Sequence, residues 1–502
     1  MAFAESTSTT ATRRRVGVAA GHPNYKWWAL SCTSLGMLLA TINSGTLIIA
    51  LPDLERSLHT SLLQLVWVIL VYMIASTVLV LSAGRLADLF GRKTAFVLGF
   101  LVFAVASLGA GFASSGTELI VWRILQGIGG AFLFANAVAL VTDAFPREQL
   151  GLAMGTNTMV AAVGLVIGPV LGGALVAIAW PWVFWFNVPF ALVGSLWGLL
   201  VLEERSGRSE ERGLDLVGVT TYVVGLTGLV LALSKGGLSG WSNSLVIVGL
   251  ALAVVLLPIF VLVEHRGRAP MLDLDLFQDR LFSAASAAAF LNGLSRFALM
   301  FLFVFYFQGP QGQSPIMAGL ELAPMAIGML LASPIAGAYA DRRGSRGLAA
   351  LGMLVSAGGL AGMTMLQADT AYVWSAVWLL LVGVGSGMFN SPNTAAMMGV
   401  VPVHRRGVAA GARVMLQNTG AVISIAFVMA IVTAAVPKDV LFKIFSGLTS
   451  GLSNEQLQPF ISNMHLALWV LAAISLLGAV ISLLRPKHVR AEVDDVILQE
   501  AA

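Results

Sequence analysis

Long apolar segments recur along the chain from Trp27 almost to its C-terminal end. A helix needs about 20 apolar residues to cross a hydrocarbon core of about 30 Å. Only 11% of the residues are charged, against roughly 25% in an ordinary soluble domain. The sequence therefore predicts an all-α polytopic membrane protein with fourteen transmembrane helices, at 27–50, 62–84, 94–113, 116–142, 151–179, 182–202, 214–234, 244–264, 281–308, 317–340, 347–367, 371–398, 408–436 and 465–485.

Basic residues indicate how the chain is oriented in the membrane. Short loops rich in Lys and Arg stay on the cytoplasmic side. With the N-terminus inside, 22 of the 29 Lys and Arg residues fall in cytoplasmic segments, four fall outside and three fall within spans. Both termini are therefore predicted to be cytoplasmic. The net charge of +4 reflects this topology, and we expect no nucleic-acid partner.

An internal repeat organises the chain. GRLADLFGRK at 84–93 matches GAYADRRGSR at 337–346, with an offset of 253. Six further positions match with an offset of 256, and they pair Gly127, Gly129, Pro146, Gly151, Gly155 and Gly164 with Gly383, Gly385, Pro402, Gly407, Gly411 and Gly420. Parallel repeats of six helices are typical of a class of secondary transporters whose substrate site lies between the two halves.

The repeat predicts two pseudo-symmetric six-helix bundles with an inserted helix pair between them. Its offset spans eight helices, so helices 1–6 correspond to 9–14 and helices 7 and 8 are the insertion. The predicted parts are a cytoplasmic tail at 1–26, an N-terminal bundle at 27–202, a linker with the inserted helices at 203–280, a C-terminal bundle at 281–485 and a cytoplasmic tail at 486–502.

Four motifs resemble those of the major facilitator superfamily. GRLADLFGRK is similar to its loop signature, RILQGIGG at 123–130 to its helix-4 arginine motif, and GLVIGPVLGG at 164–173 to its helix-5 antiporter motif. WVFWFNVP at 182–189 and the fourteen-span layout resemble its drug:proton antiporter branch, the multidrug efflux proteins. The resemblance implies a secondary active transporter that exports drugs or other amphipathic molecules by alternating access, with protons as the coupling ion.

The resemblance also implies coupling and gating roles. In the family the loop after helix 2 is a latch across the cytoplasmic face, and this role is carried onto Asp88 and Arg92. Glycines every fourth residue on helix 5 allow a neighbour to approach closely, and a proline beside them allows a bend. A plain turn and plain helix packing explain the same residues on physical grounds. The expected coupling and gating residues are Asp88, Arg92, Arg123, Gly168, Pro169 and Glu321.

Polar side chains inside spans are candidates for a substrate cavity. An arginine near the bilayer centre costs about 2.5 to 3.5 kcal/mol on insertion scales, so Arg123, Arg296 and Arg413 are expected to face the protein interior. Arg413 lies close enough to a loop to reach the membrane surface instead. Single amides are more often helix–helix contacts than ligands. As a set, the expected cavity residues are Asn43, Arg123, Gln126, Asn157, Asn292, Arg296, Asn390, Asn393, Arg413 and Gln417.

Asn43 departs from the family pattern. It stands where the antiporters usually carry an aspartate, and an asparagine cannot bind and release a proton. If proton coupling is kept, the acid lies elsewhere, and Glu321 is the carboxylate well inside a span, whereas Asp53 and Glu55 lie close to a span end. Three intramembrane arginines against one such carboxylate predict an anionic or neutral amphipathic substrate rather than a cation.

Signatures of other functions are missing from the sequence. It holds no His-Glu-x-x-His helix, no Gly-x-Ser-x-Gly elbow and no phosphate loop, and Cys32 is its only cysteine. We therefore expect no enzyme activity, cofactor or metal, and membrane lipids as the other partner. The alternatives are a facilitator or lipid-type exporter without proton coupling, and a signalling or scaffold protein that has lost transport. The expected location is the cell membrane, the cytoplasmic membrane of a prokaryote.

Overall fold

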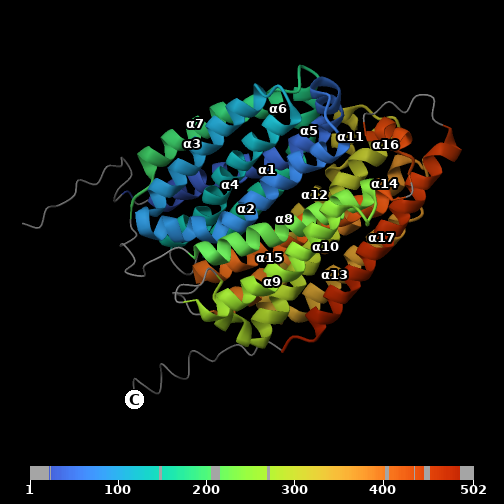
Figure 1. The fold of residues 1–502 in the computed structure, drawn as a ribbon. Helices are drawn as coiled ribbons and strands as arrows, with labels where there is room; N and C mark the ends of the chain where they lie inside the picture. The colour runs from blue at the N-terminus through green and yellow to red at the C-terminus, as the bar shows by residue number, and fades with distance from the viewer. Residues whose placement is uncertain are drawn as a thin grey trace, which may run out of the picture.

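The structure is a computed structural model, and it describes residues 22, 24–145, 150–204, 215–267, 272–401, 406–434, 436–445 and 453–486. Its secondary structure over these residues is helical throughout, without a strand among them (Figure 1). The helices are α1 Tyr25–Leu58, α2 Leu62–Phe90, α3 Arg92–Gly111, α4 Gly116–Ala144, α5 Leu150–Val176, α6 Trp182–Trp185, α7 Asn187–Val201, α8 Leu216–Ser239, α9 Ser244–Arg266, η2 Leu274–Gln278, α10 Arg280–Gln308, α11 Pro315–Glu321, α12 Ala323–Arg343, α13 Arg346–Met363, α14 Tyr372–Val400, α15 Arg406–Thr433, α16 Lys438–Phe445 and α17 Asn454–Leu483.

Most of the predicted spans coincide with one long helix each. Within the described residues, twelve helices are long and apolar enough to cross a membrane, and α1, which bends by 61° between Leu47 and Ile49, would be a thirteenth. The helix α5 occupies the fifth predicted span but is not among those counted. Fourteen spans and cytoplasmic termini therefore stay predictions. So do the domain boundaries, and most of both predicted tails lies outside the described residues.

The last span begins earlier than its hydropathy indicates. We predicted 465–485, whereas α17 starts at Asn454. The cause is a capping box, in which the Ser453 side chain accepts from the backbone N–H of Gln456 and the Gln456 side chain accepts from the backbone N–H of Ser453. The same device, with Ser61 and Gln64, starts α2. The capping box thus sets the start of α17, and its polar first turns are helical although hydropathy does not mark them as part of a span.

Glycines matched by the sequence repeat make equivalent contacts. A Cβ atom added to Gly99 of α3 would meet the carbonyl oxygen of Gly129 in α4, and one added to Gly352 of α13 would meet that of Gly385 in α14. The α2–α4 contact of Gly127 with Tyr72 likewise corresponds to the α12–α14 contact of Gly383 with Met325. The pair Pro146 and Pro402 lies outside the described residues. We call α1–α7 the first half and α10–α17 the second half.

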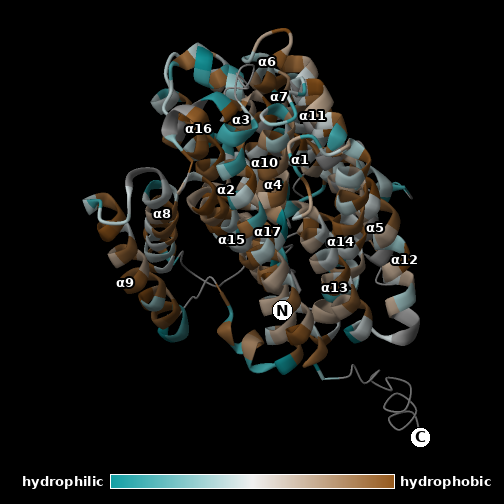
Figure 2. Ribbon diagram, turned by 90° about the vertical axis from the view of Figure 1, so that its right-hand side faces the viewer, coloured by the Kyte–Doolittle hydropathy of each residue, from teal (hydrophilic) through white to brown (hydrophobic). Residues whose placement is uncertain are grey.

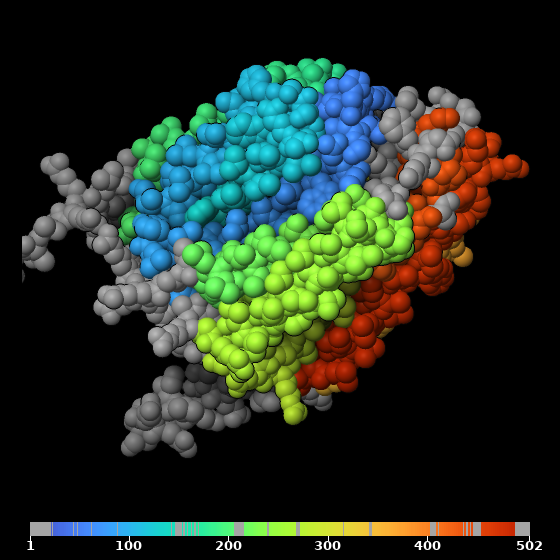
Figure 3. Space-filling view, in the orientation of Figure 1, coloured from blue at the N-terminus to red at the C-terminus, as the bar shows by residue number. Residues whose placement is uncertain are grey.

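The two inserted helices pack on each other, and α8 lies against α15 of the second half and α2 of the first (Figures 1 and 3). The Tyr222 hydroxyl of α8 hydrogen-bonds with Thr419 of α15, and its ring stacks on Phe260 of α9 with 4.8 Å between centroids. The outer face of α9 is apolar and exposed, with Val254 71% exposed, as expected of a surface that faces lipid (Figure 2).

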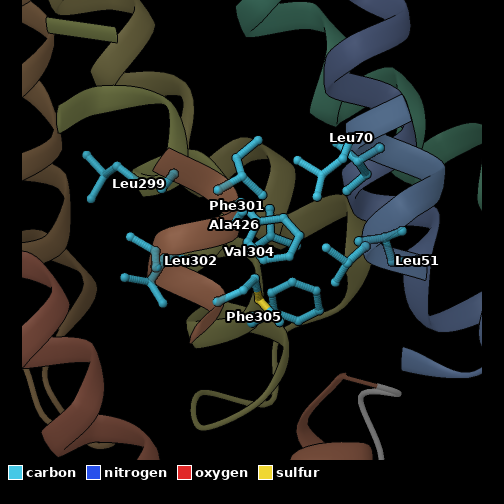
Figure 4. Close-up of a cluster of buried hydrophobic side chains, with 14 of the residues drawn as sticks. Leu51, Leu70, Leu299, Phe301, Leu302, Val304, Phe305 and Ala426 are labelled. Atoms are coloured by element: carbon cyan, nitrogen blue, oxygen red, sulfur yellow. The ribbon is translucent and has the colours of Figure 1, made fainter. Parts of the chain in front are cut away.

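One apolar cluster joins the two halves. It brings Leu51 of α1 and Leu70 of α2 together with Phe301 and Phe305 of α10 and Ala426 of α15 (Figure 4). These residues lie toward the ends of their helices that we predict to be external. The contact continues between α2 and α15 as far as Leu81 and Gly411. Smaller clusters near the predicted cytoplasmic end, such as Leu30 with Val141, Phe145 and Ala153, stay within one half.

The close α13–α14 contact gives a test of the packing. A Cβ atom on Gly352 would lie 2.6 Å from the Gly385 oxygen and 2.7 Å from the Phe389 nitrogen, whereas one on Gly358 of the same helix meets nothing within 4 Å. We expect Gly352→Ala to destabilise the protein by about 1–3 kcal/mol because backbone atoms must move. Gly358→Ala is the matched control. Thermal unfolding of the purified full-length protein measures both, and equal unfolding temperatures would contradict the packing described.

Candidate functional site

Arg123 lies at the centre of a buried polar network in the first half. It is 1% exposed, its Nε donates to the Val68 carbonyl oxygen at 3.0 Å, and one terminal nitrogen donates to Gln126 Oε1 at 2.5 Å. Its guanidinium carbon lies 4.3 Å from the centre of the Tyr72 ring. No carboxylate pairs with Arg123 among the described residues. Its charge is therefore held by neutral acceptors and an aromatic ring.

Asn43 joins this network through Gln126 rather than by direct contact with Arg123. Gln126 Nε2 donates to Asn43 Oδ1 at 3.1 Å and to Ser107 Oγ at 2.7 Å. Asn187 Nδ2, at the start of α7, approaches the same Asn43 oxygen at 3.5 Å. The network thus joins α1, α3, α4 and α7. Sequence reasoning missed Ser107, Tyr72 and Asn187 as members, although Asn187 lies in the WVFWFNVP motif.

The glycine face of α5 lies directly on α1. Cβ atoms on Gly164, Gly168 and Gly172 would meet Thr41, Gly45 and Thr46, so the two backbones are in contact as the pattern predicted. Asn157 of α5 accepts a hydrogen bond from the Ser34 hydroxyl of α1 at 2.7 Å. Asn157 thus serves as a helix–helix contact. The Pro169 side chain lies outside the described residues.

Amides in the second half form smaller contacts. Gln417 Nε2 of α15 donates to Asn390 Oδ1 of α14 at 3.3 Å. Asn393 donates to the Ala285 carbonyl oxygen of α10 at 3.1 Å, and Asn292 has the Met353 sulfur at 3.4 Å as its acceptor. The side-chain oxygens of Asn292 and Asn393 are buried without a donor. Over the described residues, no hydrogen bond links these amides to the network around Arg123.

Arg296 and Arg413 differ from Arg123 in their surroundings. Arg296 is 6% exposed, its guanidinium lies 4.5 Å from the centre of the adjacent Phe297 ring, and its Nε has no hydrogen-bond partner. The Nε of Arg413, which is less buried, also has none. Neither forms an ion pair within the described parts of the chain. Both side chains therefore carry charge that no described residue matches.

The predicted latch loop is ordered around Arg92. One terminal nitrogen of Arg92 contacts both carboxylate oxygens of Asp143 at 2.8 Å, and this pair joins the start of α3 to the last turn of α4. The pair lies within the first half. The Asp88 side chain and residues 146–149 lie outside the described residues, so the latch role of Asp88 stays a prediction.

Two carboxylates are buried near the predicted external end. Glu321, at the end of α11, is 6% exposed, and one of its oxygens has no donor. Glu55 is 3% exposed, and neither of its oxygens has a donor in the described structure. Glu55 was predicted to lie close to a span end, and it lies in the last turns of α1, which continues through Pro52 to Leu58. Glu55 is therefore a second buried acid that the sequence pattern did not reveal.

The described residues contain no group of three or more His, Cys, Asp or Glu side chains that could hold a metal ion. Within the described residues, the site consists of a connected polar network in the first half, where Asn43 Nδ2 is left without a partner, and of separate amides and arginines in the second half. Residues 33–425 match the Major Facilitator Superfamily. The chain belongs to this family. It is a multi-pass membrane transporter and not an enzyme.

Relatives in this family include named drug exporters. The chain is 30% identical to the tetracenomycin C resistance and export protein of Streptomyces glaucescens, over 80% of this chain and 75% of that one. It is 31% identical to the multidrug transporter protein MdtP of Bacillus subtilis, over 80% and 74%, and 26% identical to the riboflavin transporter RibZ of Clostridioides difficile, over 91% and 97%.

The fold is also similar to that of a solved transporter. A bacterial homologue of the human lysosomal transporter Spinster, in an inward-facing and unoccupied conformation, superposes with a TM-score of 0.66 at 15% identity. The match covers 92% of this chain and 97% of that one. It supports the fold assigned by the family match.

The Gln126 relay gives a test of the first-half network. Gln126→Leu keeps the side-chain size but leaves Arg123, Asn43 and Ser107 each without one partner. We expect the free energy of unfolding to fall by about 1–3 kcal/mol, the cost of leaving buried polar groups unmatched. Gln278→Leu, at an exposed position, is the control. An unchanged unfolding temperature in Gln126→Leu would show that the relay contributes nothing.

Proposed function

We propose that this transporter is a secondary active exporter of amphipathic small molecules that works by alternating access, with protons as the coupling ion. The observation that carries the proposal is the set of buried polar side chains on α1, α4, α10, α14 and α15, inside helices that are otherwise apolar. Buried charge and amides are kept in membrane helices where they serve a pathway. Relatives whose names state drug resistance and export support the direction of transport.

Alternating access is supported by how the two halves meet. The apolar cluster of Leu51, Leu70, Phe301 and Phe305 excludes water at the predicted external end (Figure 4). Toward the predicted cytoplasmic end the halves still meet along α2 and α15, at Leu81 and Gly411, while the smaller clusters there stay within one half. A seal of this kind can separate without breaking hydrogen bonds, because its contacts are apolar. We place the protein in the bacterial cell membrane, since the relatives named above are bacterial.

The substrate that we propose is anionic or neutral. Drug exporters for cations usually place acidic groups in the cavity, whereas the charged side chains among the candidate cavity residues here are Arg123, Arg296 and Arg413. A cavity wall with charge of one sign raises the local concentration of molecules of the opposite sign.

Export is tested with purified protein in liposomes. We expect efflux of amphipathic carboxylates and of neutral amphiphiles, and faster efflux when an inward proton gradient is imposed. Liposomes without protein and liposomes with a collapsed gradient are the controls. Failure to move any compound from a panel of anionic, neutral and cationic amphiphiles would refute the exporter assignment.

Proton coupling is tested separately at the two buried acids. We expect Glu321→Gln to abolish the stimulation of efflux by a proton gradient and to leave efflux without a gradient in place, because a glutamine cannot carry a proton. Glu455→Gln, exposed at the start of α17, is the control at the same predicted end. Glu55→Gln is the companion variant. If neither variant changes the stimulation of efflux by the proton gradient, neither acid carries the coupling proton.

A facilitator or lipid-type exporter without proton coupling is the second candidate. Asn43 favours it, because the network around Arg123 holds no group that titrates at the position of the usual aspartate. Efflux that is equally fast with and without the gradient in the wild-type protein would decide for this candidate.

A further inference from the structure

The repeat can be extended from glycines to the polar residues of the candidate site. Gly164 and Gly168 of α5 lie on Thr41 and Gly45 of α1. In the second half, Gly420 of α15 lies on Leu294 of α10, and the Ser424 hydroxyl accepts from the backbone N–H of Ala298 at 3.3 Å. Adding 253 to the α1 residue numbers gives the α10 residues, and adding 256 to the α5 residue numbers gives the α15 residues. The two contacts are therefore equivalent in the two halves.

This correspondence pairs two asparagines with two arginines. Asn43 lies between Thr41 and Gly45, so its counterpart is Arg296, which lies between Leu294 and Ala298. Asn157, by the same addition of 256, corresponds to Arg413. At two positions on equivalent helices, the first half therefore carries a neutral amide and the second half carries a guanidinium.

The residues that hold Asn43 have no polar counterparts around Arg296. Gln126, Arg123 and Ser107 correspond to residues that are apolar and at most 1% exposed, namely Val382, Leu379 and Leu360. The hydroxyl donor for Asn157 is also lost, since Ser34 corresponds to Ala287. The second half thus gained two charges and kept none of the groups that would satisfy them.

An unpaired guanidinium in such surroundings is costly, because a buried charge needs a counter-charge or hydrogen-bond acceptors. Arg123 shows that this fold can supply acceptors when an arginine is structural. Arg296 receives none from the described residues, so its guanidinium can accept a ligand as its partner. The planar guanidinium fork suits a carboxylate or another oxyanion.

Arg296 and Arg413 lie at different depths. Two contacts fix the position of α10 along α15: Ala298 is beside Ser424, and Gly293 is beside the Gln417 backbone. Along the helix axes, Arg296 is therefore at the height of roughly residues 420–422 of α15. At 1.5 Å per residue, Arg413 then lies roughly 10–14 Å closer to the start of α15. The two arginines are therefore staggered along the helices, and a substrate that moves from the start of α15 inward would meet Arg413 first and Arg296 second.

We propose that the second half recognises the charge of the substrate: Arg296 binds its oxyanion at mid-depth, Arg413 binds the same group nearer the start of α15, and the first half supplies neutral hydrogen bonds. This rests on the proposed export function and names its substrate class, an amphipathic carboxylate or comparable organic anion. The position of Arg413 at the predicted cytoplasmic end fits an exporter, whose substrate enters there.

The test compares 1-pyrenebutyrate with its methyl ester on the purified full-length protein. Equilibrium dialysis measures binding of each, and liposome efflux measures transport of each. We expect the wild-type protein to bind the carboxylate about tenfold more tightly, the value of one charge-assisted contact. Arg296→Asn replaces the arginine by the residue type of the first half and should bring the ratio of the two affinities, carboxylate over ester, close to one. Arg413→Asn should lower this ratio. Arg280→Asn, exposed at the start of α10, is the control and should keep it.

Stability separates recognition from a structural role. Because Arg296 has no partner in the described chain, Arg296→Asn should unfold at the wild-type temperature or above it. A lower unfolding temperature would make Arg296 structural and overturn the proposal. So would a wild-type protein without preference for the carboxylate, or a preference that survives Arg296→Asn. Preferential binding that depends on Arg296 without efflux would instead refute export and leave the binding site standing.

Discussion

Close approach of helix backbones at glycines is the constraint on which the rest of this structure depends. Lipid is as apolar as leucine, so helices in a membrane associate through fit rather than through a hydrophobic driving force. Here Gly99 and Gly129, and again Gly352 and Gly385, bring carbonyl oxygens and backbones into direct contact. Such contacts tolerate no added atom. They fix the axial register of each helix pair, and the register decides which side chains meet at mid-depth.

On this repeated scaffold, the two halves use their interiors differently. In the first half, Gln126 hydrogen-bonds with Arg123, Asn43 and Ser107 together and so couples α1, α3 and α4, while Asn43 Nδ2 has no partner among the described residues. In the second half, Asn292 and Arg296 lie one turn apart on α10 and each has a buried polar atom without a partner. A connected network rigidifies its bundle, whereas polar atoms without a partner, Asn43 Nδ2 among them, remain available to a ligand.

The sequence predicted the helices, the repeat and the arginines, because each leaves a local pattern in composition or spacing. It did not predict what depends on neighbours far along the chain. The Gln126 relay needs Ser107 from α3, and nothing near Ser107 marks it as buried beside an amide. The burial of Glu55 also depends on neighbours, because its place near the end of α1 does not show that other helices cover the side chain. The match of Asn43 with Arg296 was present in the numbering, but only contacts such as that of Ser424 with Ala298 fix the register of α1 against α10.

Replacement of the usual helix-1 aspartate by Asn43 has a consequence for both halves. An aspartate beside the Gln126 relay would neutralise Arg123, and its protonation would change the charge of the first half. With Asn43, the charge of the network around Arg123 stays constant throughout the transport cycle. The charge that can change on substrate binding lies at Arg296 and Arg413, and the acids that can take up a proton, Glu55 and Glu321, lie toward the predicted external end. Substrate and proton would then act on separate parts of the protein. The route between them differs for the two acids: Glu321 lies on α11 of the second half, beside α10 that carries Arg296, whereas Glu55 of α1 reaches α10 through the apolar contact at Leu51, Phe301 and Phe305 (Figure 4).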